Sequence, residues 1–158
     1  MAIRDPIAVF MKEHDTALEQ LRVLKKSAAE IKKKGYSEKT FKTMLKATEF
    51  VDEEVRVHNA KEEKALFPLI ERYVDGPTNV MREDHTKMAK IYKKLYYSIG
   101  ALKENHEDKI ARQELGEAAE AIVQLMVNHI HKENQILFPL VKRFLTKEEL
   151  REVARRML

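Results

Sequence analysis

Residues 58–68 of the chain read HNAKEEKALFP, and residues 129–139 read HIHKENQILFP. Both stretches begin with His, carry Glu four residues later and end in Leu-Phe-Pro. The offset between them is 71 residues, the difference between positions 129 and 58. Residues four apart lie one above the other on a helix face. Each stretch therefore predicts a helix that presents a histidine and a glutamate side by side.

The repeat extends beyond these two stretches. The single histidines His14 and His85 are separated by the same 71 residues, the difference between positions 85 and 14. The chain therefore consists of two helical hairpins of one design, at about residues 5–74 and 77–145. Together with a short C-terminal helix at 146–157, they suit a single domain covering positions 1 to 158.

Apolar residues recur at three- and four-residue steps in four long segments, which is typical of amphipathic helices. Turn residues separate these segments at Gly35, at Asp75-Gly76-Pro77 and near Asn105. The sequence thus predicts an all-α fold, an up-down-up-down four-helix bundle with a short C-terminal fifth helix. The expected core stripes are Ile7, Phe10, Met11, Leu18, Leu21 and Leu24; Phe41, Met44, Ala47, Val51, Val55, Leu66 and Leu69; Met81, Met88, Tyr92, Leu95 and Ile99; and Ile110, Leu115, Ala119, Ile122, Met126, Leu137 and Leu140.

Helix boundaries are marked by capping residues. Asp5 followed by proline, Ser37, and the Thr146…Glu149 capping box each predict a helix start. Pro68 and Pro139 fall inside helical patterns, where proline removes a backbone donor and crowds the preceding turn. We expect kinks at both prolines, with helix continuing to about residues 73 and 144.

Spacing predicts that the repeated polar residues meet at one level of the bundle. His14 and His58 are 44 residues apart, and their midpoint, Tyr36, lies in a predicted turn. At ~1.5 Å rise per residue, the chain returns to the same height after equal outward and return paths. His85 and His129 are separated by the same distance around the third turn. All four helices should therefore bring their marked residues together.

Four imidazoles and two carboxylates buried together need a partner, because each unpaired buried polar group costs several kcal/mol, about 2–7. Two adjacent carboxylates would also repel each other. A pair of metal ions removes both problems, and the expected ligands are His14, His58, Glu62, His85, His129 and Glu133. Iron, manganese and zinc all accept such ligands. Two iron ions are the preferred interpretation, because each would keep open positions for a small ligand. His106 and His131 fall outside the pattern and are expected at the surface.

Composition limits the other functions. The net charge of +4 arises from lysines scattered along the chain, and no nucleic-acid binding motif accompanies them. The absence of cysteine from the sequence excludes thiolate catalysis and disulfides. No apolar run approaches the ~20 residues of a membrane span. We expect a cytoplasmic protein with no membrane or nucleic-acid partner; the sequence leaves its oligomeric state open.

With these six residues and the repeated Leu-Phe-Pro, the sequence from about Pro6 to Phe144 resembles the hemerythrin-like, HHE cation-binding family. The resemblance implies a four-helix bundle with a non-haem di-iron centre bridged by Glu62 and Glu133, and by an oxo or hydroxo group. It also implies chemistry with oxygen, peroxide or nitric oxide, or a role in sensing or handling iron.

The sequence departs from oxygen-carrying hemerythrins at two positions. Those proteins have a further histidine in the third helix, where this chain has Ala89, and an aspartate five residues after the fourth-helix histidine, where this chain has Glu133 four residues on. The symmetric four-His, two-Glu set is similar to the di-iron domain of repair-of-iron-centres proteins. Those proteins usually carry an additional cysteine-containing module.

Three functional hypotheses follow. The first is a di-iron protein that binds, senses or reacts with a small diatomic or peroxide ligand, or handles iron. The second is a di-iron enzyme, namely a peroxidase, oxidase, nitric oxide reductase or iron-centre repair protein, served by an unidentified electron donor; Tyr92 is then a candidate redox residue, although a core role is the simpler interpretation. The third is a zinc-bound or metal-free helical interaction module that docks through the C-terminal helix.

Overall fold

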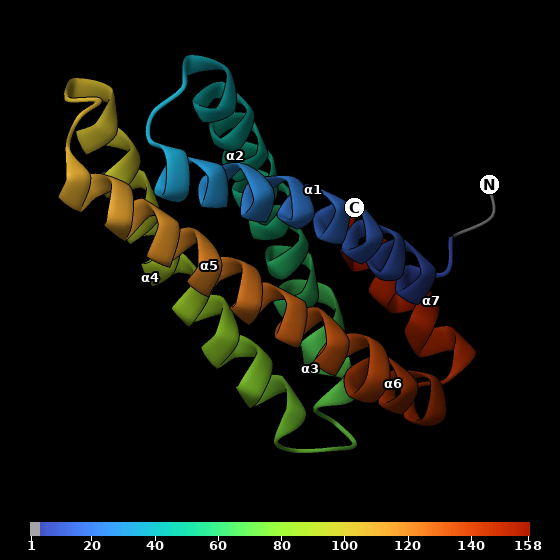
Figure 1. The fold of residues 1–158 in the computed structure, drawn as a ribbon. Coiled ribbons are helices and arrows are strands. Elements are labelled where there is room, and N and C mark those ends of the chain that lie inside the picture. The colour runs from blue at the N-terminus through green and yellow to red at the C-terminus, as the bar shows by residue number, and fades with distance from the viewer. Residues whose placement is uncertain (1–3) are drawn as a thin grey trace.

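The computed structural model describes residues 4–158 and is helical throughout, with no strand in this range. Four long helical arms and a short terminal helix follow one another along the chain (Figure 1), as the sequence predicted. The second and fourth arms each contain a π-helical turn, labelled η. The elements are α1 (Pro6–Lys34), α2 (Glu38–Lys61), η1 (Glu62–Leu66), α3 (Phe67–Ile70), α4 (Pro77–Glu104), α5 (Lys109–Lys132), η2 (Glu133–Leu137), α6 (Phe138–Phe144) and α7 (Lys147–Arg156).

The arms pack as two antiparallel hairpins, with α1 against α2 and α4 against α5, and α1 also packs against α5. The turns that join α1 to α2 and α4 to α5 lie at one end of the bundle (Figure 1). The turn between α3 and α4 lies at the opposite end, where α7 packs against α1 and η1. Residues at matching heights in the two hairpins therefore meet inside the bundle.

Two of the three predicted capping interactions are present. The backbone N–H of Ile7 donates to the Asp5 carboxylate at 3.0 Å, and Thr146 and Glu149 form the complete capping box at the start of α7. Ser37 occupies the N-cap position of α2, which confirms the predicted helix start, but its side chain makes no capping hydrogen bond.

The two prolines at which helix kinks were predicted each follow a local change of helix type. A π-helical turn precedes each of them, so that Phe67 N–H donates to the carbonyl of Glu62 and Phe138 N–H donates to that of Glu133. Each proline then lies in the first turn of a new α-helical segment. Its missing N–H needs no partner at that position. The helix of the second arm ends at Ile70 rather than at about 73, with a turn over residues 71–73, whereas that of the fourth arm ends at Phe144 as predicted.

The core forms two apolar clusters along the bundle axis. One is built from the long helices between residues 17 and 130, including Leu24, Met44 and Ile122. The other combines Ile7, Phe10 and the α3 and α6 segments with Val153 of α7. Two residues expected in the core stripes are exposed instead: Met11 is 39% exposed and Ile110 is 73% exposed.

In the described part of the chain, no helix combines the length and apolar character needed to cross a membrane. The apolar residues of α7 are also used within the chain. Val153 is fully buried, and Leu150 and Met157 pack against the same cluster. This side of α7 therefore covers the end of the bundle, and it is not available as the docking surface considered in the third hypothesis.

Candidate metal centre

The structure brings all six predicted residues together in a polar layer between the two apolar clusters. Their side chains come from α1, the ends of α2 and α5, the first residues of η1 and η2, and α4. No side chain among them is more than 8% exposed. The six residues form two overlapping groups, in each of which the candidate ligand atoms lie within 4.8 Å of one another.

The first group contains His14, His58 and the two glutamates. The Nε2 atom of His14 lies 2.8 Å from Oε1 of Glu133 and 3.1 Å from Nε2 of His58. The Nε2 atom of His58 lies 3.3 Å from Oε1 of Glu62. The Nε2 atoms of both rings face the two carboxylates. Two imidazoles and two carboxylates therefore surround one candidate metal position.

The second group contains His85, His129 and the same glutamates. The Nε2 atom of His85 lies 3.5 Å from Oε1 of Glu62, and that of His129 lies 3.4 Å from Oε2 of Glu133. Glu133 therefore turns one oxygen toward each group, and the Oε1 atom of Glu62 faces a histidine of each group. Both carboxylates are thus placed between two adjacent positions.

Several of these buried atoms have no hydrogen-bond partner among the described residues. They are both carboxylate oxygens of Glu62, Oε2 of Glu133, and the Nε2 atoms of His85 and His129. Leaving such atoms unpaired is costly unless a cation or another polar group satisfies them. Carboxylate oxygen and imidazole nitrogen are donors that iron, manganese and zinc accept. The residues present therefore fit a pair of metal ions.

The electrostatics agree with this interpretation. Burial raises the pKa of Glu62, and the neighbouring carboxylate of Glu133 raises it further. Burial acts in the same direction on Glu133, but close polar contacts with Glu62, His129 and His14 outweigh it and hold the pKa of Glu133 well below its usual range. Burial lowers the pKa of His58, but the attraction of Glu62 outweighs this and raises it well above its usual value. The buried pair of carboxylates thus requires positive charge nearby, as protons or metal ions.

Each histidine is held from behind by an oxygen atom that the sequence did not single out. The Nδ1–H groups of the four rings donate to side-chain oxygens at 2.7 to 3.0 Å. This contact fixes the tautomer and leaves Nε2 free to bind a metal. The four pairs are His14 with Asn134, His58 with Glu13, His85 with Glu63, and His129 with Asp84.

These supporting residues obey the 71-residue offset. Glu13 in the first hairpin corresponds to Asp84 in the second, and Lys61 corresponds to Lys132. Lys61 donates a hydrogen bond to Glu13, and Lys132 donates one to Asp84. The residues adjacent to the ligands therefore carried a usable signal. It was overlooked because single charged residues on helices usually face solvent.

The Leu-Phe-Pro motif also contributes to the site. Phe138 stacks on the ring of His14 with centroids 5.4 Å apart, and Phe67 stacks on His85 at 6.0 Å. The phenylalanine after each π-helical turn therefore covers the single histidine of α1 or α4. Aromatic faces here restrict the orientation of both imidazoles and exclude water from one side.

The other histidines and Tyr92 lie where the sequence placed them. His106 and His131 are exposed, and His106 stacks on Tyr36 at 3.6 Å. Tyr92 is buried in the core, and its hydroxyl contacts Met126 Sδ at 3.5 Å. Burial strongly raises the pKa of Tyr92, which keeps its phenol protonated.

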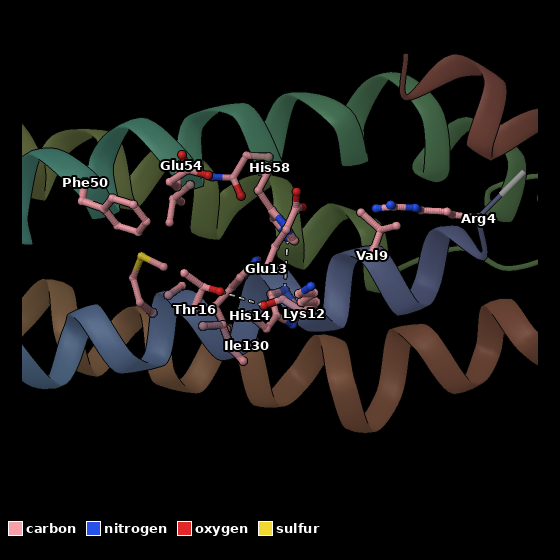
Figure 2. A pocket seen from close by; sticks show the side chains of 15 residues that line it. Arg4, Val9, Lys12, Glu13, His14, Thr16, Phe50, Glu54, His58 and Ile130 are labelled. Atoms are coloured by element: carbon pink, nitrogen blue, oxygen red, sulfur yellow. Dashed lines mark hydrogen bonds and ion pairs between the residues drawn. The ribbon is translucent and has the colours of Figure 1, made fainter.

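Two cavities reach the site from different sides. One, of about 280 Å³, is lined by His14 and His58 together with apolar residues such as Phe50 and Ile130. Figure 2 shows His14 and His58 directed toward each other, with Phe50 farther along this cavity. The other, of about 530 Å³, contacts His85 and includes Ala89. The first cavity also contacts His129, so that all four histidines lie next to space that a small molecule can occupy.

Comparisons with known proteins place this geometry in a family. The profile of the hemerythrin HHE cation binding domain matches residues 5–141 and, in a second overlapping match, residues 76–158. The chain is 25% identical over 136 residues to the iron-sulfur cluster repair protein YtfE of Cronobacter sakazakii, covering 83% of this chain and 62% of that protein. It is 24% identical to the proteins of the same name from Escherichia coli O139:H28 and Shigella boydii serotype 18, with the same coverage. The chain thus spans less than two thirds of the length of these relatives. The family match covers most of the sequence, and the chain belongs to the hemerythrin HHE cation binding domain family.

Proposed function

We propose that the protein is a non-haem di-iron protein that reacts with oxygen, peroxide or nitric oxide and takes part in handling iron centres. The observation that supports this most strongly is the pair of overlapping ligand groups around Glu62 and Glu133, whose buried donor atoms have no other hydrogen-bond partner among the described residues. The names of the relatives favour iron over manganese and zinc, which the donor atoms alone do not distinguish.

In this proposal the protein side chains hold and shield the metal pair. His14 and His58 would hold one ion and His85 and His129 the other, with Glu62 and Glu133 belonging to both ligand groups. A bound pair of redox-active irons would supply up to two electrons for the reduction of a small oxidant. The stacked rings of Phe67 and Phe138 exclude water, and the cavity beside His14 admits a small molecule of low polarity.

Metal analysis of protein purified from iron-supplied cells tests the proposal. We expect about two irons per chain in the wild type, as in other bundles with paired carboxylates. The double variant Glu62→Ala, Glu133→Ala should contain almost none. His131→Ala removes an exposed histidine next to the site and serves as the control, with unchanged iron content. Equal iron content in the double variant and the wild type would overturn the proposal.

A catalytic role is the second candidate, and the two cavities favour it, because together they give a small molecule access to all four histidines. The discriminating measurement is turnover with a supplied reductant. A peroxidase, oxidase or nitric oxide reductase consumes many equivalents of oxidant per chain. A single stoichiometric change in the absorption spectrum instead identifies a binding or sensing protein.

Iron-centre repair can be examined separately, because the relatives carry that name. The iron-loaded protein would be incubated with an iron-sulfur dehydratase damaged by peroxide, together with a reductant and sulfide. We expect recovery of dehydratase activity to exceed that obtained with the Glu62→Ala, Glu133→Ala variant. Equal recovery with both proteins would remove repair from the proposed function while leaving iron binding intact.

A further inference from the structure

The four oxygen acceptors behind the histidines differ at one matched pair of positions. Glu63 and Asn134 lie 71 residues apart, at equivalent places just after the two glutamates of the site. Glu63 accepts from His85 Nδ1 at 3.0 Å, and Asn134 accepts from His14 Nδ1 at 2.7 Å. One acceptor is a carboxylate and the other is a neutral amide. This is the point at which the two-fold repeat of the surrounding residues fails.

The remaining two acceptors balance each other. Glu13 behind His58 and Asp84 behind His129 are both carboxylates, and each accepts a hydrogen bond from a lysine. The lysine charge offsets the carboxylate charge in both hairpins. Their contributions to the two metal positions are therefore similar, and the difference is confined to Glu63 and Asn134.

The charge of Glu63 is not compensated in the same way. Its contact in the structure is with His85, and its side chain is 41% exposed. Arg82 lies over the ring of Phe67 nearby, but it is already paired with Glu71 at 2.8 Å. The His85 side of the site thus has one more uncompensated negative charge than the His14 side.

A carboxylate behind a histidine increases the electron density that the imidazole offers to a bound cation, and outer partners of this kind change metal affinity by about 10- to 100-fold. We infer that the two metal positions are inequivalent, and that the position beside His85 and His129 retains its cation more strongly because Glu63 stands where the other hairpin has Asn134. This inference rests on the two-metal site of the proposed function. It assigns Glu63 and Asn134 as positioning residues for the metal ligands.

Stepwise removal of iron from the loaded protein tests the inference. The protein would be exposed to a chelator, iron release followed over time, and crystals of the half-stripped protein examined by anomalous diffraction at the iron edge. We expect two release phases that differ about 10- to 100-fold in rate. The iron that remains should lie beside His85 and His129. Equal occupancy of the two positions, or retention beside His14 and His58, would overturn the inference.

Isosteric variants separate charge from shape. Glu63→Gln should speed the slow phase, whereas Asn134→Asp should slow the fast phase, so that each brings the two rates together from opposite directions. The exchange of both residues should reverse the order of release. Glu53→Gln, an exposed carboxylate on α2, is the control and should leave both rates unchanged.

The outcomes distinguish this inference from the proposed function. A wild-type protein that contains about one iron or none contradicts the two-metal site itself. Two irons released in one phase from equally occupied positions contradict only the inequivalence. Release rates that do not respond to either Glu63→Gln or Asn134→Asp, with both variants folded and loaded, also contradict it.

Discussion

At the residue scale, the site depends on oxygen atoms behind the imidazoles as much as on the ligands in front of them. Each Nδ1–H group donates to an acceptor from another part of the chain, so that the four Nε2 atoms point inward. The six inward-facing residues could be predicted from the sequence because their spacing repeats on apolar helix faces. The acceptors were not predicted, although Glu13 and Asp84 share the 71-residue offset, because single carboxylates on helices usually face solvent.

Removal of one acceptor should weaken metal binding without removing a ligand. Asp84→Ala leaves His129 free to rotate and leaves Lys132 without its carboxylate partner. We expect retention of iron under chelator dialysis to fall about 10- to 100-fold. Asp84→Asn keeps an oxygen acceptor and should retain more iron than Asp84→Ala. Wild-type retention by Asp84→Ala would show that this contact does not support the site.

At the element scale, each arm that carries a His-Glu pair is divided by a π-helical turn beginning at the glutamate. The turn inserts one residue into the hydrogen-bond ladder, admits the following proline and turns Phe67 or Phe138 onto a histidine. Helix type and length were predictable from the apolar periodicity. The π-helical turns were not predictable, because one turn in which the backbone hydrogen bonds span five residues instead of four hardly alters the spacing of the apolar residues. The proline at each place predicted only a kink.

Capping residues at two helix starts allow a matched comparison. Thr146 accepts a hydrogen bond from Glu149 N at 3.1 Å within the capping box of α7, whereas Ser37 makes no side-chain cap at α2. Thr146→Ala should lower the free energy of unfolding by about 0.5–2 kcal/mol, and Ser37→Ala should lower it by much less. Urea denaturation followed by circular dichroism measures both. Equal losses would contradict the assigned capping interactions.

Two helical glycines provide another matched pair. A Cβ atom at Gly116 would lie 2.9 Å from Lys32 Cβ and 2.5 Å from its Cδ, whereas a Cβ atom at Gly100 has no such neighbour within 4 Å. Gly116→Ala should destabilise the protein by about 1–3 kcal/mol through overpacking of α5 against α1. Gly100→Ala should stabilise it by about 0.5–1 kcal/mol, because alanine favours a helix. Stabilisation by Gly116→Ala would show that α1 and α5 pack less closely.

At the scale of the whole molecule, the 71-residue repeat makes the bundle nearly symmetric about the polar layer. The repeat was sufficient to predict that residues on four helices meet at one level, because equal loop positions return the chain to equal heights. The repeat was not sufficient to predict the exposure of Ile110. This residue continues the apolar stripe of its helix but lies beyond the end of the core. The packing of α7 against one end of the bundle could not be predicted from the repeat, because α7 lies outside the repeated residues.

The stability of the metal-free protein should depend on pH. Burial alone lowers the pKa of both His58 and His129, but the attraction of the buried glutamates outweighs it, and both pKa values are raised. Protonation of these rings therefore favours the folded state. This contribution is present below the ordinary histidine pKa of about 6.5 and is lost as pH rises through the raised values. Burial also raises the pKa of Glu62, so that its ionisation acts in the same direction.

The Tm of metal-free protein should accordingly fall as the pH rises above about 6.5, because protons no longer balance the buried carboxylates. Metal ions that occupy the site replace those protons and bind only the folded state, so that the loaded protein should have a higher Tm and little pH dependence in this range. Differential scanning calorimetry measures both forms. A constant or rising Tm for the metal-free protein across this range would contradict the assigned electrostatics.

The most direct measurement is a crystal structure of the iron-loaded protein with anomalous data at the iron edge. Two anomalous peaks are predicted between Glu62 and Glu133, one beside His14 and His58 and the other beside His85 and His129. Iron bound elsewhere, for example at exposed His106 or His131, or a single peak in fully loaded protein, would contradict the two-metal centre.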